Sequence, residues 1–147
     1  MADTKTLPND VFFEYVCQRL SEGRTVNIPL TGISMSPLLR EGRDSLVLSP
    51  LPADAPLHKY DVVLFRYRGS YLLHRVVSIN GDTVTTRGDA LASHEQVPRT
   101  DILALLTAVQ NIQTGKETPC NTFWKLRSII VICWKKLKRK VKRLKKR

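Results

Sequence analysis

Cysteine is scarce in this sequence, and the few cysteines form no pattern. Cys17, Cys120 and Cys133 are the only ones among 147 residues, and no CxxC pair occurs. An odd, widely spaced set argues against a disulfide framework and against a thiol metal site. The three histidines add no metal-ligand spacing, and the seven glycines form no phosphate-binding loop. We therefore expect reduced cysteines and a protein that uses no metal or other cofactor.

Long apolar segments are also missing. No stretch reaches the roughly 18 apolar residues that a transmembrane helix needs. The first ten residues, MADTKTLPND, lack the apolar core of a signal peptide. We expect neither a signal peptide nor a transmembrane helix. The 42% hydrophobic content is enough for one core, so we expect a single domain with at most one appendage.

Negative charge is absent from the end of the chain. Residues 125–147 hold twelve of the 24 Lys and Arg residues and no Asp or Glu. Residues 1–124 hold the other twelve together with all thirteen acidic residues, which gives a net charge of −1. The formal charge of +11 therefore belongs to the tail, and the body of the protein is electrostatically ordinary.

Apolar residues continue through the basic tail at helical spacing. Residues 123–134 read FWKLRSIIVICW, which is too short to span a bilayer, and Leu137, Val141 and Leu144 extend the apolar stripe. This pattern predicts a basic amphipathic helix on an anionic membrane surface, through residues 123–147. No nucleic-acid recognition module accompanies it, so we do not expect nucleic acid as a partner. Because basic segments stay cytoplasmic, we expect peripheral association at the cytoplasmic face.

The rest of the chain has the pattern of a β protein. Apolar residues at three- and four-residue spacing predict a helix from about residue 9 to Gly23. Short apolar segments separated by turn residues then predict a mainly β fold, either a small barrel or a folded sheet. The expected strands are 25–30, 45–48, 61–67, 71–79, 83–87 and 102–110, with loops at 49–58 and 90–100.

The last of these segments, 102–110, also fits a short helix, but its place at the end of a β series favours a strand. Residues 111–119 (NIQTGKETP) are polar and predict a hinge. We therefore divide the chain into a β domain with an N-terminal helix (1–110), a hinge (111–119) and a basic amphipathic tail (120–147).

The segment 31–37 (TGISMSP) contains a candidate nucleophile, Ser34, at the end of the first predicted strand. Serine needs a base to take its proton. His58 and His94 fall in predicted loops, whereas His74 lies within a strand. Histidine titrates near neutrality, so His74 could accept the serine proton and return it to a leaving amine.

A buried imidazole needs a partner for its second ring nitrogen, normally a carboxylate that fixes the tautomer. Asp89, which follows a glycine at a strand end, is the first candidate, Glu95 the second and Asp101 the third, and spacing does not separate them. Gly32 leaves room either for a substrate or for close backbone packing, and the backbone N–H of Ser34 could stabilise an oxyanion.

Several segments follow one another in a recognisable order: 32–37 (GISMSP), 39–48 (LREGRDSLVL), 59–65 (KYDVVLF), 73–77 (LHRVV) and 86–89 (TRGD). Together they resemble the signal peptidase I superfamily, which also includes the self-cleaving peptidases of SOS-type repressors. The resemblance covers about residues 28–108 and implies a mostly β, partly open barrel. It implies that Ser34 is the nucleophile, His74 the general base and Asp89 the acid that orients His74, with Gly32 and Met35 as substrate contacts.

The same resemblance implies a function. It predicts a serine endopeptidase that cleaves an extended, leader-like peptide or preprotein, bound as an added β-strand with small residues near the cut. A histidine base is similar to the endoplasmic-reticulum, archaeal and sporulation-type members, since bacterial housekeeping members use lysine. The alternative is a non-catalytic, peptide-binding descendant of the same fold that acts as a membrane-surface adaptor.

The chain departs from the family pattern in identifiable ways. We find no amino-terminal membrane anchor of the kind that signal peptidases carry. Arg43 is an extra residue in a Gly-Asp turn, and Tyr60 replaces a glycine. Residues 90–93 (ALAS) replace an asparagine-rich stretch, which keeps Glu95 open as the acid beside Asp89.

Overall fold

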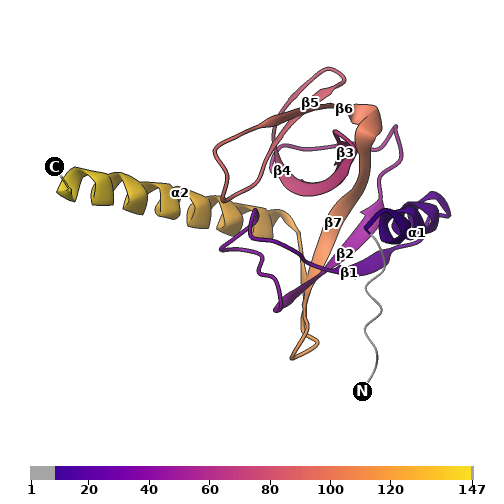
Figure 1. Cartoon of the computed structure of the whole chain (residues 1–147), viewed down its shortest axis with the longest axis horizontal. Helices are drawn as coiled ribbons and strands as arrows, with labels where there is room; N and C mark the ends of the chain where they lie inside the picture. Colours follow the sequence, from indigo (N-terminus) through magenta and orange to yellow (C-terminus); the bar gives the residue numbers. More distant parts are fainter. Residues whose placement is uncertain (1–8, 147) are drawn as a thin grey trace.

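Residues 9–146 are described by a computed structural model, in which eight strands form one curled sheet between two helices (Figure 1). This architecture confirms the predicted mainly β fold with a helix at each end. Residues 1–8 and residue 147, which the predicted domain and tail include, lie outside the described residues. The elements are α1 (Asn9–Ser21), β1 (Val26–Pro29), β2 (Asp44–Pro50), β3 (Val62–Tyr67), β4 (Ser70–Asn80), β5 (Thr83–Arg87), β6 (Glu95–Pro98), a 3-10 turn (Arg99–Asp101), β7 (Ile102–Asn111), β8 (Glu117–Pro119) and α2 (Thr122–Lys145).

The sheet is antiparallel and runs in the order β1-β2-β7-β3-β4-β5-β6, with β8 added to β7. The pairings β2–β7, β3–β7 and β4–β5 each contain a shift in register. Such bulges bend a strand and increase its twist. The sheet accordingly curls into a half-barrel, with β1 and β6 as its two end strands (Figure 1).

Two buried apolar clusters hold the sheet together. β2 and β7 alternate between buried and half-buried residues, as period-two strands with one face on a core should. The larger cluster joins residues of β1, β2 and β7 to Val16 and Leu20 of α1, and the smaller one includes Phe65 and Val76. Full burial of such a side chain stabilises the fold by about 1.5–3 kcal/mol.

β6 forms inside the segment that we predicted to be the loop 90–100, so that prediction is wrong for residues 95–98. Val97, 2% exposed, is paired with the buried Val84 of β5. A four-residue strand with one buried valine and a terminal proline gives no periodic signal. Pairing with β5, and not local pattern, makes this segment a strand.

β8 forms within the segment expected to be a hinge. Its three residues are exposed and pair with residues 108–110 at the edge of β7. A polar edge strand of this length is invisible to hydrophobic periodicity. The chain therefore enters α2 directly from the sheet.

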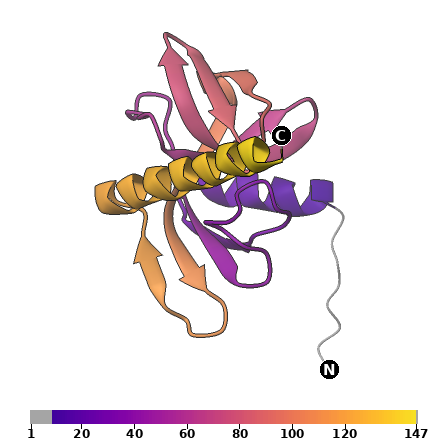
Figure 2. The same cartoon turned by 90° about the vertical axis from the view of Figure 1, so that its left-hand side faces the viewer.

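The first half of α2 packs against the domain, whereas the second half projects beyond it (Figures 1 and 2). Ser128 is fully buried, Trp124 is half-buried against the Arg75 guanidinium, and Lys125 forms an ion pair with Asp61. Residues 136–146 are all exposed. Neither helix within residues 9–146 combines the length and the apolar content that crossing a bilayer requires.

Candidate active site

Ser34 lies in the loop that joins β1 to β2, residues 30–43, which we call the Ser34 loop. Gly32 reverses the chain there at φ +84°, a conformation that favours glycine. The N–H and the hydroxyl of Ser36 both donate to the carbonyl of Ile33, at 3.0 and 2.8 Å. Met35, predicted to contact substrate, is only 1% exposed and belongs to the core. Met35 therefore anchors the loop to the core and does not face a substrate. The substrate role of the exposed Gly32 stays a prediction.

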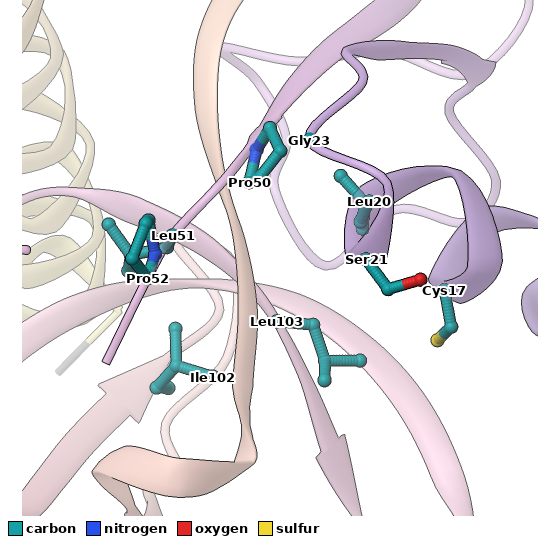
Figure 3. Close-up of a pocket in the computed structure, with 9 residues that line it drawn as sticks. All are labelled: Cys17, Leu20, Ser21, Gly23, Pro50, Leu51, Pro52, Ile102 and Leu103. Atoms are coloured by element: carbon teal, nitrogen blue, oxygen red, sulfur yellow. The ribbon is translucent and has the colours of Figure 1, made fainter. Parts of the chain in front are cut away.

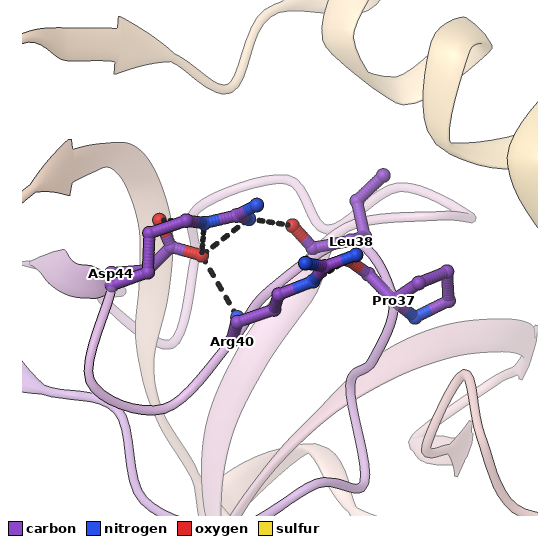
Figure 4. A network of polar contacts seen from close by, with 5 residues as sticks. Pro37, Leu38, Arg40 and Asp44 are labelled. Atoms are coloured by element: carbon purple, nitrogen blue, oxygen red, sulfur yellow. Dashed lines mark hydrogen bonds and ion pairs between the residues drawn. The ribbon is translucent and has the colours of Figure 1, made fainter.

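Asp44 closes this loop from its far end (Figure 4). Its Oδ2 accepts hydrogen bonds from the backbone N–H of Arg40 at 2.8 Å and from Arg43 Nη2 at 2.7 Å. Arg43 Nη2 also donates to the carbonyl of Leu38 at 2.8 Å. Hydrogen bonding to Asp44 raises the pKa of the Arg43 guanidinium above its ordinary value. Arg43, the extra residue of the turn, thus ties Leu38, inside the loop, to Asp44 at the start of β2.

His74 is buried on β4 and contacts a carboxylate. Its Nδ1 lies 3.0 Å from Glu95 Oε2, and the Thr86 hydroxyl donates to the same oxygen at 2.9 Å. The His74 and Glu95 side chains are 4% and 8% exposed. The ring of Phe65 packs edge-on against the imidazole, with 5.9 Å between the ring centroids. A carboxylate at this distance favours the tautomer with its proton on Nδ1, which leaves Nε2 as a proton acceptor.

Gly88 lies between the His74 ring and the Ser34 loop. A Cβ atom built on Gly88 would be 2.9 Å from the Ser34 carbonyl oxygen and 3.1 Å from His74 Nε2. The N–H of Ala90 donates to that same carbonyl at 2.9 Å. The segment after β5 therefore holds the Ser34 loop on the Nε2 side of His74, and only a residue without a side chain fits between them.

Asp89 does not contact His74, which corrects the first choice of carboxylate. Its two oxygens accept from Arg75 Nε and Nη2, both at 2.9 Å, and both side chains are 3% exposed. Arg75 also donates to the carbonyl of Tyr60 at 3.0 Å. Successive residues of a strand point to opposite faces. Arg75 therefore faces away from His74 and pairs with Asp89, and Glu95 holds the position that Asp89 was expected to fill.

The remaining candidates have other places in the fold. Asp101 ends the 3-10 turn before β7. The His58 backbone N–H donates to Asp61, and His94 is exposed. Within residues 9–146, no group of three or more His, Cys, Asp and Glu side chains is arranged to hold a metal ion.

Tyr60 explains one departure from the family pattern. Its φ is +76°, in the left-handed region where glycine is the usual residue. A side chain in this conformation costs about 1–2 kcal/mol. The Tyr60 N–H donates to the carbonyl of Val76 at 2.8 Å, and its own carbonyl accepts from Arg75. These two bonds to β4 hold the conformation that glycine would adopt without strain.

A cavity of about 440 Å³ lies between α1 and the ends of β2 and β7 (Figure 3). Cys17 of α1, Pro50 at the end of β2 and Ile102 of β7 contribute to its lining, which holds no histidine and no carboxylate. It therefore lacks the groups of an acid–base site. The candidate site is the cluster of Ser34, His74 and Glu95.

Comparison with protein families gives the family of the chain. Residues 24–124 match the family described as signal peptidase, peptidase S26. The chain belongs to this family. Signal peptidase family members are generally serine peptidases, and the family is membrane-associated. No curated protein matches the chain.

The matched region contains the whole candidate site of this signal peptidase family member. Two supporting residues escaped the sequence analysis, Thr86 as a second donor to Glu95 and Gly88 as the spacer beside Ser34. Both stand in the segment 86–89 that carries the family resemblance. The signal was therefore present, but it pointed to Asp89 as the functional residue of that segment.

Proposed function

We propose that this signal peptidase family member is a serine endopeptidase in which Ser34 is the nucleophile, His74 the general base and Glu95 the carboxylate that orients His74. The buried His74–Glu95 pair, whose Nε2 faces the Ser34 loop across Gly88, carries the proposal. A desolvated imidazole held by a carboxylate is suited to proton transfer near neutral pH.

The proposed reaction has two stages. Ser34 Oγ attacks the scissile carbonyl while its proton passes to His74 Nε2, and Glu95 stabilises the imidazolium that forms. The backbone N–H of Ser34 is the candidate donor to the oxyanion. His74 then gives the proton to the leaving amine, and water, activated by the same imidazole, hydrolyses the acyl-enzyme.

The strand edges near the site suit an extended peptide substrate. β1, which leads into the Ser34 loop, ends the sheet, and within residues 9–146 it pairs only with β2. In β4, the pairing with β5 begins at Arg75, so the part that leads to His74 is paired with β3 alone. Exposed strand edges bind peptides by adding a strand. This arrangement supports leader-like peptides or preproteins as the substrate class.

The test is cleavage of extended peptides that carry small residues at the cut. We expect Ser34→Ala and His74→Ala each to lower kcat by at least about 10³-fold, because each removes an essential member of a unit. Ser70→Ala, at the exposed serine that begins β4, is the matched control and should retain full activity. A serine-directed phosphonate should label the wild type and not the Ser34→Ala protein.

Two results would count against this function. Full activity of the Ser34→Ala protein would exclude Ser34 as the nucleophile. Tight binding of such peptides by the wild type, without turnover and without phosphonate labelling, would instead support the non-catalytic peptide-binding adaptor.

A further inference from the structure

The outward face of α2 carries a continuous stripe of exposed apolar side chains. Each is between 43% and 75% exposed, and together they extend over the whole length of the helix. At about 100° per residue, the seven positions fall within roughly 80° of the helix circumference. We call this set the outer stripe: Phe123, Leu126, Ile130, Trp134, Leu137, Val141 and Leu144.

The domain holds α2 so that the outer stripe faces away from it. Trp124 packs on the Arg75 guanidinium, at 5.4 Å from ring centroid to Cζ, and Ser128 is fully buried. Lys135 Nζ donates to the carbonyl of Ser36 at 3.5 Å. These contacts all lie on the face of α2 opposite the outer stripe. The helix therefore cannot rotate to bury the stripe on its own domain without losing them.

The charges around the outer stripe are of one sign. Residues 118–147 contain no Asp or Glu, and twelve Lys and Arg residues follow Trp124. By helical position, Lys138 and Lys145 lie on one flank of the stripe and Lys140 on the other. Lys138 Nζ is 5.5 Å from the Trp134 ring centroid. A partner for this face must therefore offer an apolar interior beneath an anionic surface.

We propose that the outer stripe is a docking surface for an anionic lipid bilayer, on which α2 lies parallel to the membrane plane. Apolar side chains enter the acyl boundary while the flanking cations contact lipid phosphates. A second copy of the chain fits less well, because pairing two such helices would bring two sets of cations together. Nucleic acid would use the cations and leave the apolar stripe exposed to water.

None of the proposed catalytic residues lies on the outer stripe, so docking does not depend on the proposed function. Docking would nevertheless set the position of the candidate site relative to the membrane. Because Lys135 contacts the Ser34 loop from the face opposite the stripe, docking would hold that loop about one helix diameter, roughly 10–12 Å, from the lipid. The surface of the membrane would then be where the domain meets its peptide.

The test uses the full chain and sedimentation with vesicles. We expect binding to vesicles of phosphatidylcholine mixed with phosphatidylglycerol, weak binding to phosphatidylcholine alone, and progressive release by added salt. The double variant Ile130→Ser/Trp134→Ser should partition at least about tenfold more weakly, because two anchoring side chains are lost. The control Ile79→Ser/Ile112→Ser removes exposed apolar residues of the domain and should bind as the wild type does.

Fluorescence reports on the stripe separately. The chain has two tryptophans, so Trp124→Phe leaves Trp134 as the only one. Its emission should shift to the blue when anionic vesicles are added. The proposal is overturned by failure of the wild type to sediment with anionic vesicles, by equal losses in both double variants, or by an unshifted Trp134 emission. A stable dimer that buries Trp134 in the absence of lipid would also overturn the proposal. So would nucleic-acid binding that persists in the Ile130→Ser/Trp134→Ser variant, if the wild type does not bind vesicles.

Discussion

His74 and Arg75 are neighbours in β4, and each forms a buried pair with a carboxylate. His74 pairs with Glu95 at the start of β6, and Arg75 pairs with Asp89 just after β5. Both pairs are almost fully removed from water. The two pairs differ in the other contacts that the basic side chain makes besides the one to its carboxylate. This difference separates a side chain that could react from one that only supports the fold.

Arg75 uses its guanidinium for structure alone. Its Nε and Nη2 bind Asp89, its Nη1 binds the Tyr60 carbonyl, and its face packs against Trp124 of α2. A guanidinium group does not exchange a proton near neutral pH. His74 uses only Nδ1 for its carboxylate, and its Nε2 is directed toward the Ser34 loop. Two buried pairs of similar appearance therefore serve the fold and the proposed chemistry separately.

The largest expected effect concerns the His74 pair. Glu95→Gln should lower kcat by about 10³–10⁴-fold, because an amide can donate to Nδ1 and favour the tautomer in which Nε2 cannot accept a proton. The free energy of unfolding should change by no more than about 1 kcal/mol, since the amide has nearly the same shape. Peptide cleavage and urea unfolding measure the two effects. Glu117→Gln, at an exposed position of β8, should alter neither. A Glu95→Gln enzyme with wild-type kcat would remove Glu95 from the proposed centre.

Asp89→Asn should have the opposite profile. It leaves the Arg75 charge buried without a counter-ion, which costs about 3 kcal/mol of folding free energy. The folded fraction should cleave peptide with a kcat near that of the wild type, because Asp89 does not touch His74. Urea unfolding and active-site titration separate the two quantities, and the exposed Asp54→Asn is the control. A large loss of kcat in correctly folded Asp89→Asn protein would mean that the two pairs are not independent.

The smallest effect that we expect is a change in the reactivity of Cys120, which reports on the packing around the Arg75–Asp89 pair. Burial raises the pKa of the Cys120 thiol to about 12, although Arg75 and Lys125 act to lower it. A raised pKa keeps the thiol protonated, so its thiolate fraction at pH 8 is only about 10⁻⁴. Iodoacetamide at pH 8 should therefore modify the exposed Cys133 first and leave Cys120 unmodified in the native state.

Labelling can also be followed in the variants by mass spectrometry. Cys120 should become reactive in Asp89→Asn protein, as the packing around Arg75 loosens, and stay protected in Glu95→Gln protein. Equal labelling of Cys120 and Cys133 in the wild type would contradict the burial of Cys120.

The fold was largely predictable where apolar residues form distinct segments. The strands over 62–67, 70–80 and 102–111 are short apolar segments bounded by polar or turn residues, and the helix from Thr122 carries an apolar stripe at helical spacing. β6 and β8 were not predictable, because each is short, mostly polar and stabilised by pairing with a distant strand. Met35 was also misassigned, since a residue beside a nucleophile gives no sign in sequence of pointing into the core.

The chemical components of the candidate site can be read from the sequence alone. Ser34, His74 and the two acids Asp89 and Glu95 are all visible in it, as is the one-signed charge of the tail. Which carboxylate pairs with which basic side chain depends on the three-dimensional arrangement of the strands. Strand alternation turns His74 and Arg75 to opposite faces, and the β5–β6 pairing then brings Glu95 to one face while the end of β5 leaves Asp89 on the other. Such pairings depend on register between strands, which no local pattern encodes.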